Sequence, residues 1–150
     1  MSDWTPDYGG MVKKSFGSGG FGADWLKTRI FVVEDEKAFV DVYQKIFDII
    51  DFEIADWAYS GEEAVSMFKK MKERPALIIM DHRLPKMNGV ETMIEILRMD
   101  PTAKVLFVSA DERARKLAMD NGALDFIQKP FALAQFISIT TKCAGVKQPE

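Results

Sequence analysis

The sequence predicts an α/β fold in which five helices cover a doubly wound, five-stranded parallel sheet. From residue 28 onward, short apolar runs alternate with segments of helical period. The runs are almost continuously apolar, as in strands that are buried on both faces. Because connections of a few residues join these elements, neighbouring strands must be parallel, with crossover helices on both sides of the sheet.

The first half of this region alternates strand and helix twice. We expect a strand at 29–33, a helix at 36–52, a strand at 53–59 and a helix that begins near 61. Ser60 and Glu63 form the pattern of a capping box for the second helix. Pro75 closes that helix off before the next strand.

The second half continues the alternation. We expect strands at 76–80, 104–109 and 123–128, and helices at 90–99, 112–121 and 131–145. Asn88 or Gly89 opens the first of these helices, and Gly122 ends the second. The last helix carries more apolar side chains than one core-facing stripe needs. These side chains are Phe131, Leu133, Phe136, Ile137 and Ile139. They indicate either a surface that binds a partner or a second copy of the chain, or deep burial in the core.

Composition limits the classes of function. A chain of 150 residues with 47% hydrophobic residues builds one core of ordinary domain size. The 20 basic and 23 acidic residues are interspersed, so we expect no nucleic-acid partner. The single cysteine, Cys143, indicates a reducing compartment and a cytoplasmic location. No run approaches the roughly 18 to 20 apolar residues of a membrane span, so we expect no membrane insertion.

Three segments are distinguished by their composition. Residues 1–27 hold most of the glycines and show no sustained period, which predicts a flexible N-terminal arm. Its aromatic residues either dock on the domain or a partner, or belong to a dispensable tail. Residues 28–146 form the domain, and residues 147–150 form a short tail.

Charged and polar residues follow four of the strands. Glu34, Asp35 and Glu36 follow the first, Asp81 the third, Ser109 with Ala110 ends the fourth, and Lys129 with Pro130 follows the fifth. Each has an ordinary explanation, such as a favourable charge at a helix start, a cap or a solvated loop. The carboxyl ends of parallel strands meet at one edge of a sheet, so we expect these side chains to converge there.

A converging set of this kind has a definite chemistry. Asp35 and Asp81 repel one another unless a cation joins them, Glu34 is a further candidate ligand, and oxygen ligands suit Mg²⁺. Asp81 is then the expected nucleophile, which forms an aspartyl phosphate. Lys129 pairs with a phosphate oxygen, and Ser109 donates a hydrogen bond to another.

Residues 28 to about 146 resemble the receiver domain of two-component response regulators, of the single-domain chemotaxis type. The motifs that carry the resemblance are Glu34-Asp35, Asp81 with Leu84-Pro85-Lys86-Met87-Asn88-Gly89, Ser109-Ala110, Gly122-Ala123 and Lys129-Pro130-Phe131. The resemblance implies a flavodoxin-like fold of receiver type with Asp81 as phosphoacceptor. It also implies Mg²⁺ on Asp35, Asp81 and the main-chain carbonyl of Arg83, with Glu34 as the other acid.

The resemblance also implies the partners. A sensor histidine kinase or phosphotransfer protein donates the phosphoryl group, and the domain is a signalling phosphoacceptor rather than an enzyme. Magnesium-dependent self-phosphorylation from small donors and self-dephosphorylation are expected. We expect no output domain after Glu150, and we therefore expect the signal to pass by contact with a downstream protein that the sequence does not name.

The family's switch maps onto Ser109 and Phe126, although Phe126 is equally explained as a core aromatic. The resemblance implies a cis peptide bond between Lys129 and Pro130. Arg83 and Asp111 occupy the positions that tune dephosphorylation, and we hypothesise that they pair over the phosphate and slow its hydrolysis. His82 is expected to point away from Asp81, its neighbour at the strand end.

Three other functions compete with this interpretation. A flavin or nucleotide binder needs a loop of backbone donors after the first strand, whereas Glu34-Asp35-Glu36 is negatively charged. A phosphatase with an aspartate nucleophile generally carries a second acid two residues later, where this chain has Arg83. A degenerate receiver used only for binding would not need Asp81, the acidic pair, Ser109 and Lys129 together.

Overall fold

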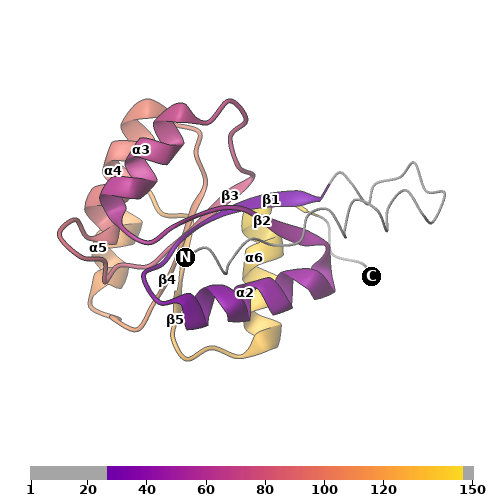
Figure 1. Ribbon diagram of the computed structural model, residues 1–150. Coiled ribbons are helices and arrows are strands. Elements are labelled where there is room, and N and C mark those ends of the chain that lie inside the picture. The colour runs from indigo at the N-terminus through magenta and orange to yellow at the C-terminus, as the bar shows by residue number, and fades with distance from the viewer. Residues whose placement is uncertain (1–26, 147–150) are drawn as a thin grey trace.

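The structure is a computed structural model that describes residues 27–146, drawn as ribbons in Figure 1. The expected tail at 147–150 lies outside the described residues, and so does the expected arm at 1–27 except for Lys27. The described residues form five strands and five helices that alternate along the chain. No helix among them is long and apolar enough to cross a bilayer.

One parallel sheet organises the domain. Its strands are β1 (Thr28–Val33), β2 (Phe52–Ala58), β3 (Leu77–Met80), β4 (Val105–Ser109) and β5 (Asp125–Gln128). The helices are α2 (Lys37–Ile50), α3 (Gly61–Lys70), α4 (Gly89–Met99), α5 (Ala114–Asp120) and α6 (Leu133–Ala144). The strands lie in the order β2-β1-β3-β4-β5. The predicted doubly wound, five-stranded parallel fold is confirmed.

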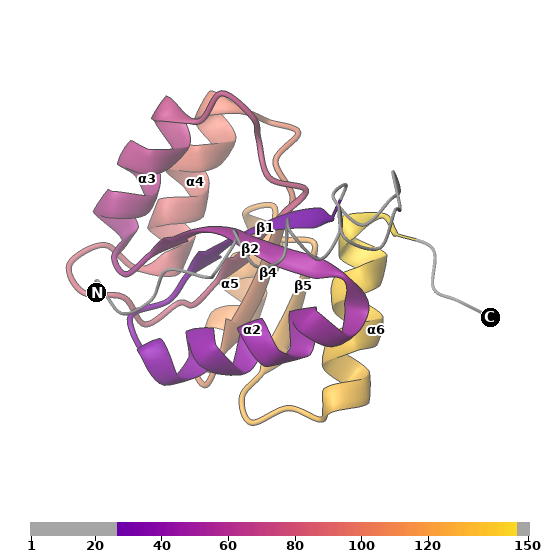
Figure 2. The same cartoon turned by 45° about the vertical axis from the view of Figure 1, so that its right-hand side comes forward.

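The helices form two layers, with α2 and α6 on one face of the sheet and α3, α4 and α5 on the other (Figures 1 and 2). Alternate residues of β1 therefore enter different cores. Phe31 and Val33 belong to the core under α3, α4 and α5, whereas Ile30 and Val32 belong to the core under α2 and α6. Burial on both faces is the reason that the strands are continuously apolar in sequence.

Helix starts follow the polar signals in the sequence. At α4, Asn88 Oδ1 accepts a hydrogen bond from Glu91 N at 2.9 Å, and Glu91 Oε1 accepts one from Asn88 N at 3.1 Å. The cap is therefore Asn88 and not Gly89. At α3, Ser60 Oγ accepts from Glu63 N at 3.1 Å as predicted. The Glu63 carboxylate, however, accepts from Tyr59 N, so the predicted capping box is only half formed.

Full or partial burial against the core accounts for four of the five apolar side chains that the sequence places at the last helix. Phe136 is fully buried, and Phe131, Ile137 and Ile139 pack against the core under α2 and α6. Only Leu133 of the five is largely exposed, at 49%. A homodimer formed through this face stays a prediction.

The turn after β3 brings the start of α4 against the strand end. Gly89 N donates a hydrogen bond to His82 O at 2.9 Å. A Cβ atom at position 89 would lie 2.2 Å from Asp81 O and 2.8 Å from His82 Cα. Glycine is required here because the helix must approach the backbone of Asp81 this closely.

Replacing Gly89 with alanine tests this close contact. Helix propensity alone favours alanine, so a loss of stability isolates the clash. We expect the free energy of unfolding to fall by about 2 kcal/mol, the range for overpacking a filled site. Urea denaturation measures the change, and a Gly89→Ala protein as stable as the wild type would contradict the argument.

Candidate functional site

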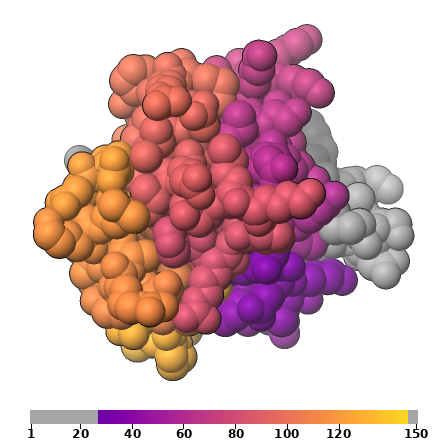
Figure 3. All heavy atoms as spheres, turned by 90° about the vertical axis from the view of Figure 1, so that its left-hand side faces the viewer, coloured from indigo at the N-terminus to yellow at the C-terminus, as the bar shows by residue number. Residues whose placement is uncertain are grey.

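The residues that follow β1, β3 and β5 meet at one edge of the sheet. Carboxylate oxygens of Glu34, Asp35 and Asp81 all lie within 4.8 Å of one another. Lys129, from the end of β5, reaches into the same cluster. In Figure 3 the indigo start of α2, the rose segment after β3 and the orange segment after β4 lie close together on the face that is turned to the viewer. The predicted convergence is therefore present in the fold.

Lys129 is the central cation of the cluster, and its side chain is only 6% exposed. Its Nζ lies 2.6 Å from Glu34 Oε1 and 3.7 Å from Asp81 Oδ2. The ring centroid of Phe39 lies 3.7 Å from the same nitrogen. A buried ammonium needs such neighbours because it has lost most of its contact with water.

Glu34 is 1% exposed and is held by backbone and side-chain contacts. Its Oε2 accepts a hydrogen bond from Glu36 N at 3.2 Å, and its main-chain oxygen accepts one from Trp57 Nε1 at 2.8 Å. Burial, followed by the negative charge of Asp81, raises the pKa of Glu34 to about 8, and Lys129 opposes both effects.

Asp81 is 5% exposed and lies at the wall of a pocket of about 310 Å³. Asp81 N donates to Val33 O at 3.0 Å, and Asp81 Oδ1 accepts from Arg83 N at 3.4 Å. The pocket is lined by Glu36, Phe39, Asp81, Arg83, Ala110, Lys129 and Pro130. Asp81 is therefore a carboxylate with an open approach on one side and an ammonium group beside it.

Ser109 is fully buried next to this pocket, and its Oγ accepts a hydrogen bond from Asp111 N at 3.2 Å. Among the described residues no ion pair joins Asp111 to Arg83, and their pairing over a phosphate stays a prediction. The Asp111 carboxylate lies 3.0 Å from Arg113 Nε. The hydrogen bond from Arg113 is the main cause that lowers the pKa of Asp111, and the charge of Arg83 adds a smaller effect.

Phe126 is 2% exposed and packs between an aromatic ring and a cation. Its ring stacks on Phe107 at 6.2 Å, and the Arg115 guanidinium lies 4.8 Å from the ring centroid. Arg115 Nη1 also donates to Phe126 O at 3.1 Å. The His82 ring lies 6.4 Å from that of Phe107, on the core side of β3. His82 does not line the pocket at Asp81, as expected.

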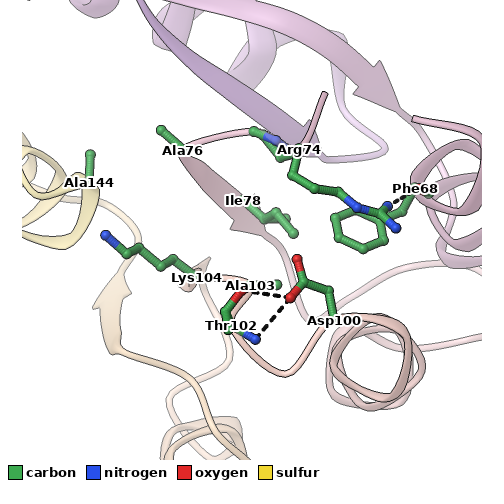
Figure 4. Close-up of a pocket in the computed structure, with 10 residues that line it drawn as sticks. Phe68, Arg74, Ala76, Ile78, Asp100, Thr102, Ala103, Lys104 and Ala144 are labelled. Atoms are coloured by element: carbon green, nitrogen blue, oxygen red, sulfur yellow. Dashed lines mark hydrogen bonds between the residues drawn. The ribbon is translucent and has the colours of Figure 1, made fainter. Parts of the chain in front are cut away.

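The expected cis peptide bond between Lys129 and Pro130 is present. A second pocket, of about 210 Å³, lies at the opposite edge of the sheet, before β3 and β4 (Figure 4). Its acid, Asp100, is already bonded to the amide and hydroxyl of Thr102. Within residues 27–146 the cluster of Glu34, Asp35 and Asp81 is the one group of side chains arranged to hold a metal ion.

Comparison with known proteins identifies the family. The family model described as the response regulator receiver domain matches residues 30–141. The chain belongs to the response regulator receiver domain family. It is a single receiver domain of the chemotaxis type, and such domains act in signalling and are not classical enzymes.

Three relatives align over nearly their whole length with most of this chain. This receiver domain is 35% identical to the protein CcdB of Bacillus subtilis over 79% of this chain and 98% of that protein. It is 34% identical to the chemotaxis protein CheY of Thermotoga maritima over 76% and 95% of the two chains. The structure of the CheX–CheY–BeF₃–Mg²⁺ complex from Borrelia burgdorferi superposes on 86% of this chain and 98% of the solved one, with a TM-score of 0.74 and 30% identity.

Sequence reasoning missed two neighbours of the receiver's charge cluster. Phe39 belongs to the apolar stripe of α2, and nothing in that period indicates a contact with Lys129. Trp57 lies on β2, which carries no expected site residue, yet its indole donates to the backbone of Glu34. Both contacts depend on how α2 and β2 lie against the end of β1, which spacing along the chain does not encode.

The raised pKa of Glu34 predicts how stability depends on pH without divalent metal. Between the unfolded value near 4.5 and about 8, the folded state holds a proton that the unfolded state has lost. The free energy of unfolding should therefore fall as pH rises through this range, by at most about 1.4 kcal/mol per pH unit for one proton. Denaturation in EDTA from pH 5 to 9 measures the slope.

Glu34→Gln removes this proton and should flatten the slope. Glu112→Gln serves as the control, because Glu112 is far more exposed and pairs with Arg115 on α5. An unchanged slope in Glu34→Gln would show that another group causes the pH dependence.

Proposed function

We propose that this protein is a receiver that accepts a phosphoryl group on Asp81 and signals through phosphorylation-dependent contact with another protein. The observation that supports this best is the pocket that opens on Asp81, with the Lys129 ammonium 3.7 Å from its carboxylate. The proposed receiver unit is residues 28–146, preceded by an arm at 1–27 and followed by a short tail at 147–150.

In the proposed reaction, one carboxylate oxygen of Asp81 attacks phosphorus in a phosphohistidine. The new oxygen–phosphorus bond forms as the nitrogen–phosphorus bond breaks, and the donor imidazole leaves with the bonding pair. Lys129 pairs with an oxygen of the transferred group, because its ammonium already lies beside Asp81. Ser109, whose Oγ now only accepts a hydrogen bond, has its hydroxyl proton available for a second oxygen.

The acidic cluster fits Mg²⁺, since its donors are hard oxygen atoms and its carboxylates are close enough to repel one another. Asp35, Asp81 and the main-chain carbonyl of Arg83 are the proposed ligands, and Glu34 is the neighbouring acid. Bound Mg²⁺ supplies positive charge that balances the carboxylates and the phosphoryl oxygens. Asp35 suits this role because it is exposed at the cluster, whereas Glu34 is committed to Lys129.

The proposed donor is a sensor histidine kinase or a phosphotransfer protein, and the proposed location is the cytoplasm. Self-phosphorylation from small phosphodonors and self-dephosphorylation belong to the same proposal. The CheY of Borrelia burgdorferi forms a complex with CheX. By likeness to that arrangement, the proposal includes a downstream protein that contacts the phosphorylated domain. It also includes a homodimer formed through α6.

The proposed readout is a change in packing near Ser109. Phosphate contacts would draw the Ser109 hydroxyl away from Asp111 N, and Phe126 packs close to this position through the ring of Phe107 on β4. A shift of this kind biases two arrangements that already exist in equilibrium. Arg115 connects Phe126 to α5, so α5 and β5 form the surface on which a partner would sense the change.

Treatment with acetyl phosphate and Mg²⁺, followed by intact-mass measurement, tests the proposed acceptor. Wild type should gain one phosphoryl group, and Asp81→Asn should gain none because its amide is a poor nucleophile. Asp120→Asn is the matched control, since Asp120 is an exposed acid on α5 that pairs with Lys116. Equal labelling of wild type and Asp81→Asn would refute the assignment.

Arg83 is the exposed cation at the mouth of the same pocket. We predict that Arg83 shields the phosphoryl group and slows its hydrolysis, even though Asp111 is paired with Arg113. Arg83→Asn should shorten the lifetime of the phosphorylated protein severalfold, as followed by the decay of the phosphorylated mass after the donor is removed. Arg113→Asn is the control, and an unchanged or longer lifetime in Arg83→Asn would end the hypothesis.

A further inference from the structure

Phe39 covers the Lys129 ammonium group from α2. The distance from Nζ to the ring centroid is 3.7 Å, well inside the range of a cation–π contact. Phe39 also lines the pocket on Asp81, so this ring forms part of the wall that an incoming group meets. The carboxylates and the Lys129 ammonium at the pocket do not require an aromatic residue at position 39. The helical period of α2 requires only an apolar one.

The three neighbours of Nζ account for its three N–H groups. Glu34 Oε1 accepts one at 2.6 Å, Asp81 Oδ2 attracts a second from 3.7 Å, and the π face of Phe39 receives the third. Another acid is within the same pocket, because Glu36 is exposed and lines it. Without the Phe39 ring, the Lys129 ammonium could bind water or the Glu36 carboxylate in place of Asp81.

We propose that Phe39 is a positioning residue that holds the Lys129 ammonium beside Asp81 for phosphoryl transfer. The inference rests on the proposed function. The ring attracts the cation electrostatically and excludes water from that side. An aliphatic side chain of similar size excludes water but does not attract the cation. As the phosphoryl group arrives, the ammonium exchanges part of its contact with Glu34 for a phosphoryl oxygen and stays under the ring.

A series of fluorinated phenylalanines at position 39 tests this role. Fluorine atoms withdraw charge from the π face while they leave the ring nearly the same shape and no less apolar. The initial rate of Asp81 phosphorylation by acetyl phosphate should fall stepwise from mono- to trifluorophenylalanine, by roughly tenfold over the series. Phe39→Leu should be phosphorylated as slowly as the protein with trifluorophenylalanine. Phe39→Trp, which keeps an aromatic face, should be phosphorylated at the wild-type rate.

Phe68 provides the matched control. Its ring faces the Arg74 guanidinium at 4.0 Å, at the opposite edge of the sheet (Figure 4). The same fluorinated residues at position 68 weaken a second cation–π contact and should leave the phosphorylation rate unchanged. The comparison separates a specific effect at Lys129 from a general effect of fluorine on stability.

The outcomes separate this inference from the function on which it rests. If wild type takes up no phosphoryl group, the proposed function fails and the role of Phe39 fails with it. If wild type is phosphorylated on Asp81 and the rate does not follow fluorination at position 39, the role of Phe39 alone is refuted. An equal decline in the series at position 68 also refutes it.

Discussion

The structure depends on the burial of opposite charges at the carboxyl edge of its sheet. Glu34, Asp81 and Lys129 are each less than a tenth exposed, and their side chains come from three different strand ends. Removing charges from water costs several kcal/mol for each ion unless partners replace the solvent. The fold meets that cost by placing the Asp81 carboxylate beside the Lys129 ammonium and by a hydrogen bond from Lys129 to Glu34, whose pKa is raised to about 8. The arrangement leaves two acids for one buried base, which is the reason that the site is suited to a further cation.

The surrounding fold fixes the parts of this cluster. Parallel pairing of β1 with β3 sets Asp81 N against Val33 O, one residue before Glu34. Gly89 then lets α4 start against the backbone of Asp81, and the Asn88 cap holds that start in place. The place of the Asp81 carboxylate at its pocket therefore depends on backbone contacts that have no reactive groups of their own. Mutations in those contacts act on the site through position and not through charge.

The sequence predicted which residues meet at the carboxyl edge of the sheet better than it predicted the contacts between their side chains. Continuous apolar strands fix a parallel sheet, and parallel strands bring Glu34, Asp81, Ser109 and Lys129 to one edge whatever their separation along the chain. The pairing of Asp111 with Arg113 was beyond this reasoning, because Arg83 reaches the same edge of the sheet from the end of β3 and only the backbone path after β4 favours Arg113. Phe39 was missed for a related reason, since helical period places it on a face but not over Lys129. The roles of the site residues still rest on their chemistry and on family likeness.

The central claim is that Asp35, Asp81 and Lys129 belong to one charge cluster, and that this cluster takes a divalent ion. Calorimetric titration of the metal-free protein with MgCl₂ tests it most directly, with Asp35→Asn beside wild type and Asp120→Asn as the control. The account predicts one Mg²⁺ ion per wild-type chain, the same affinity in Asp120→Asn, and binding weakened roughly tenfold or more in Asp35→Asn. Equal affinity in Asp35→Asn and wild type would contradict it.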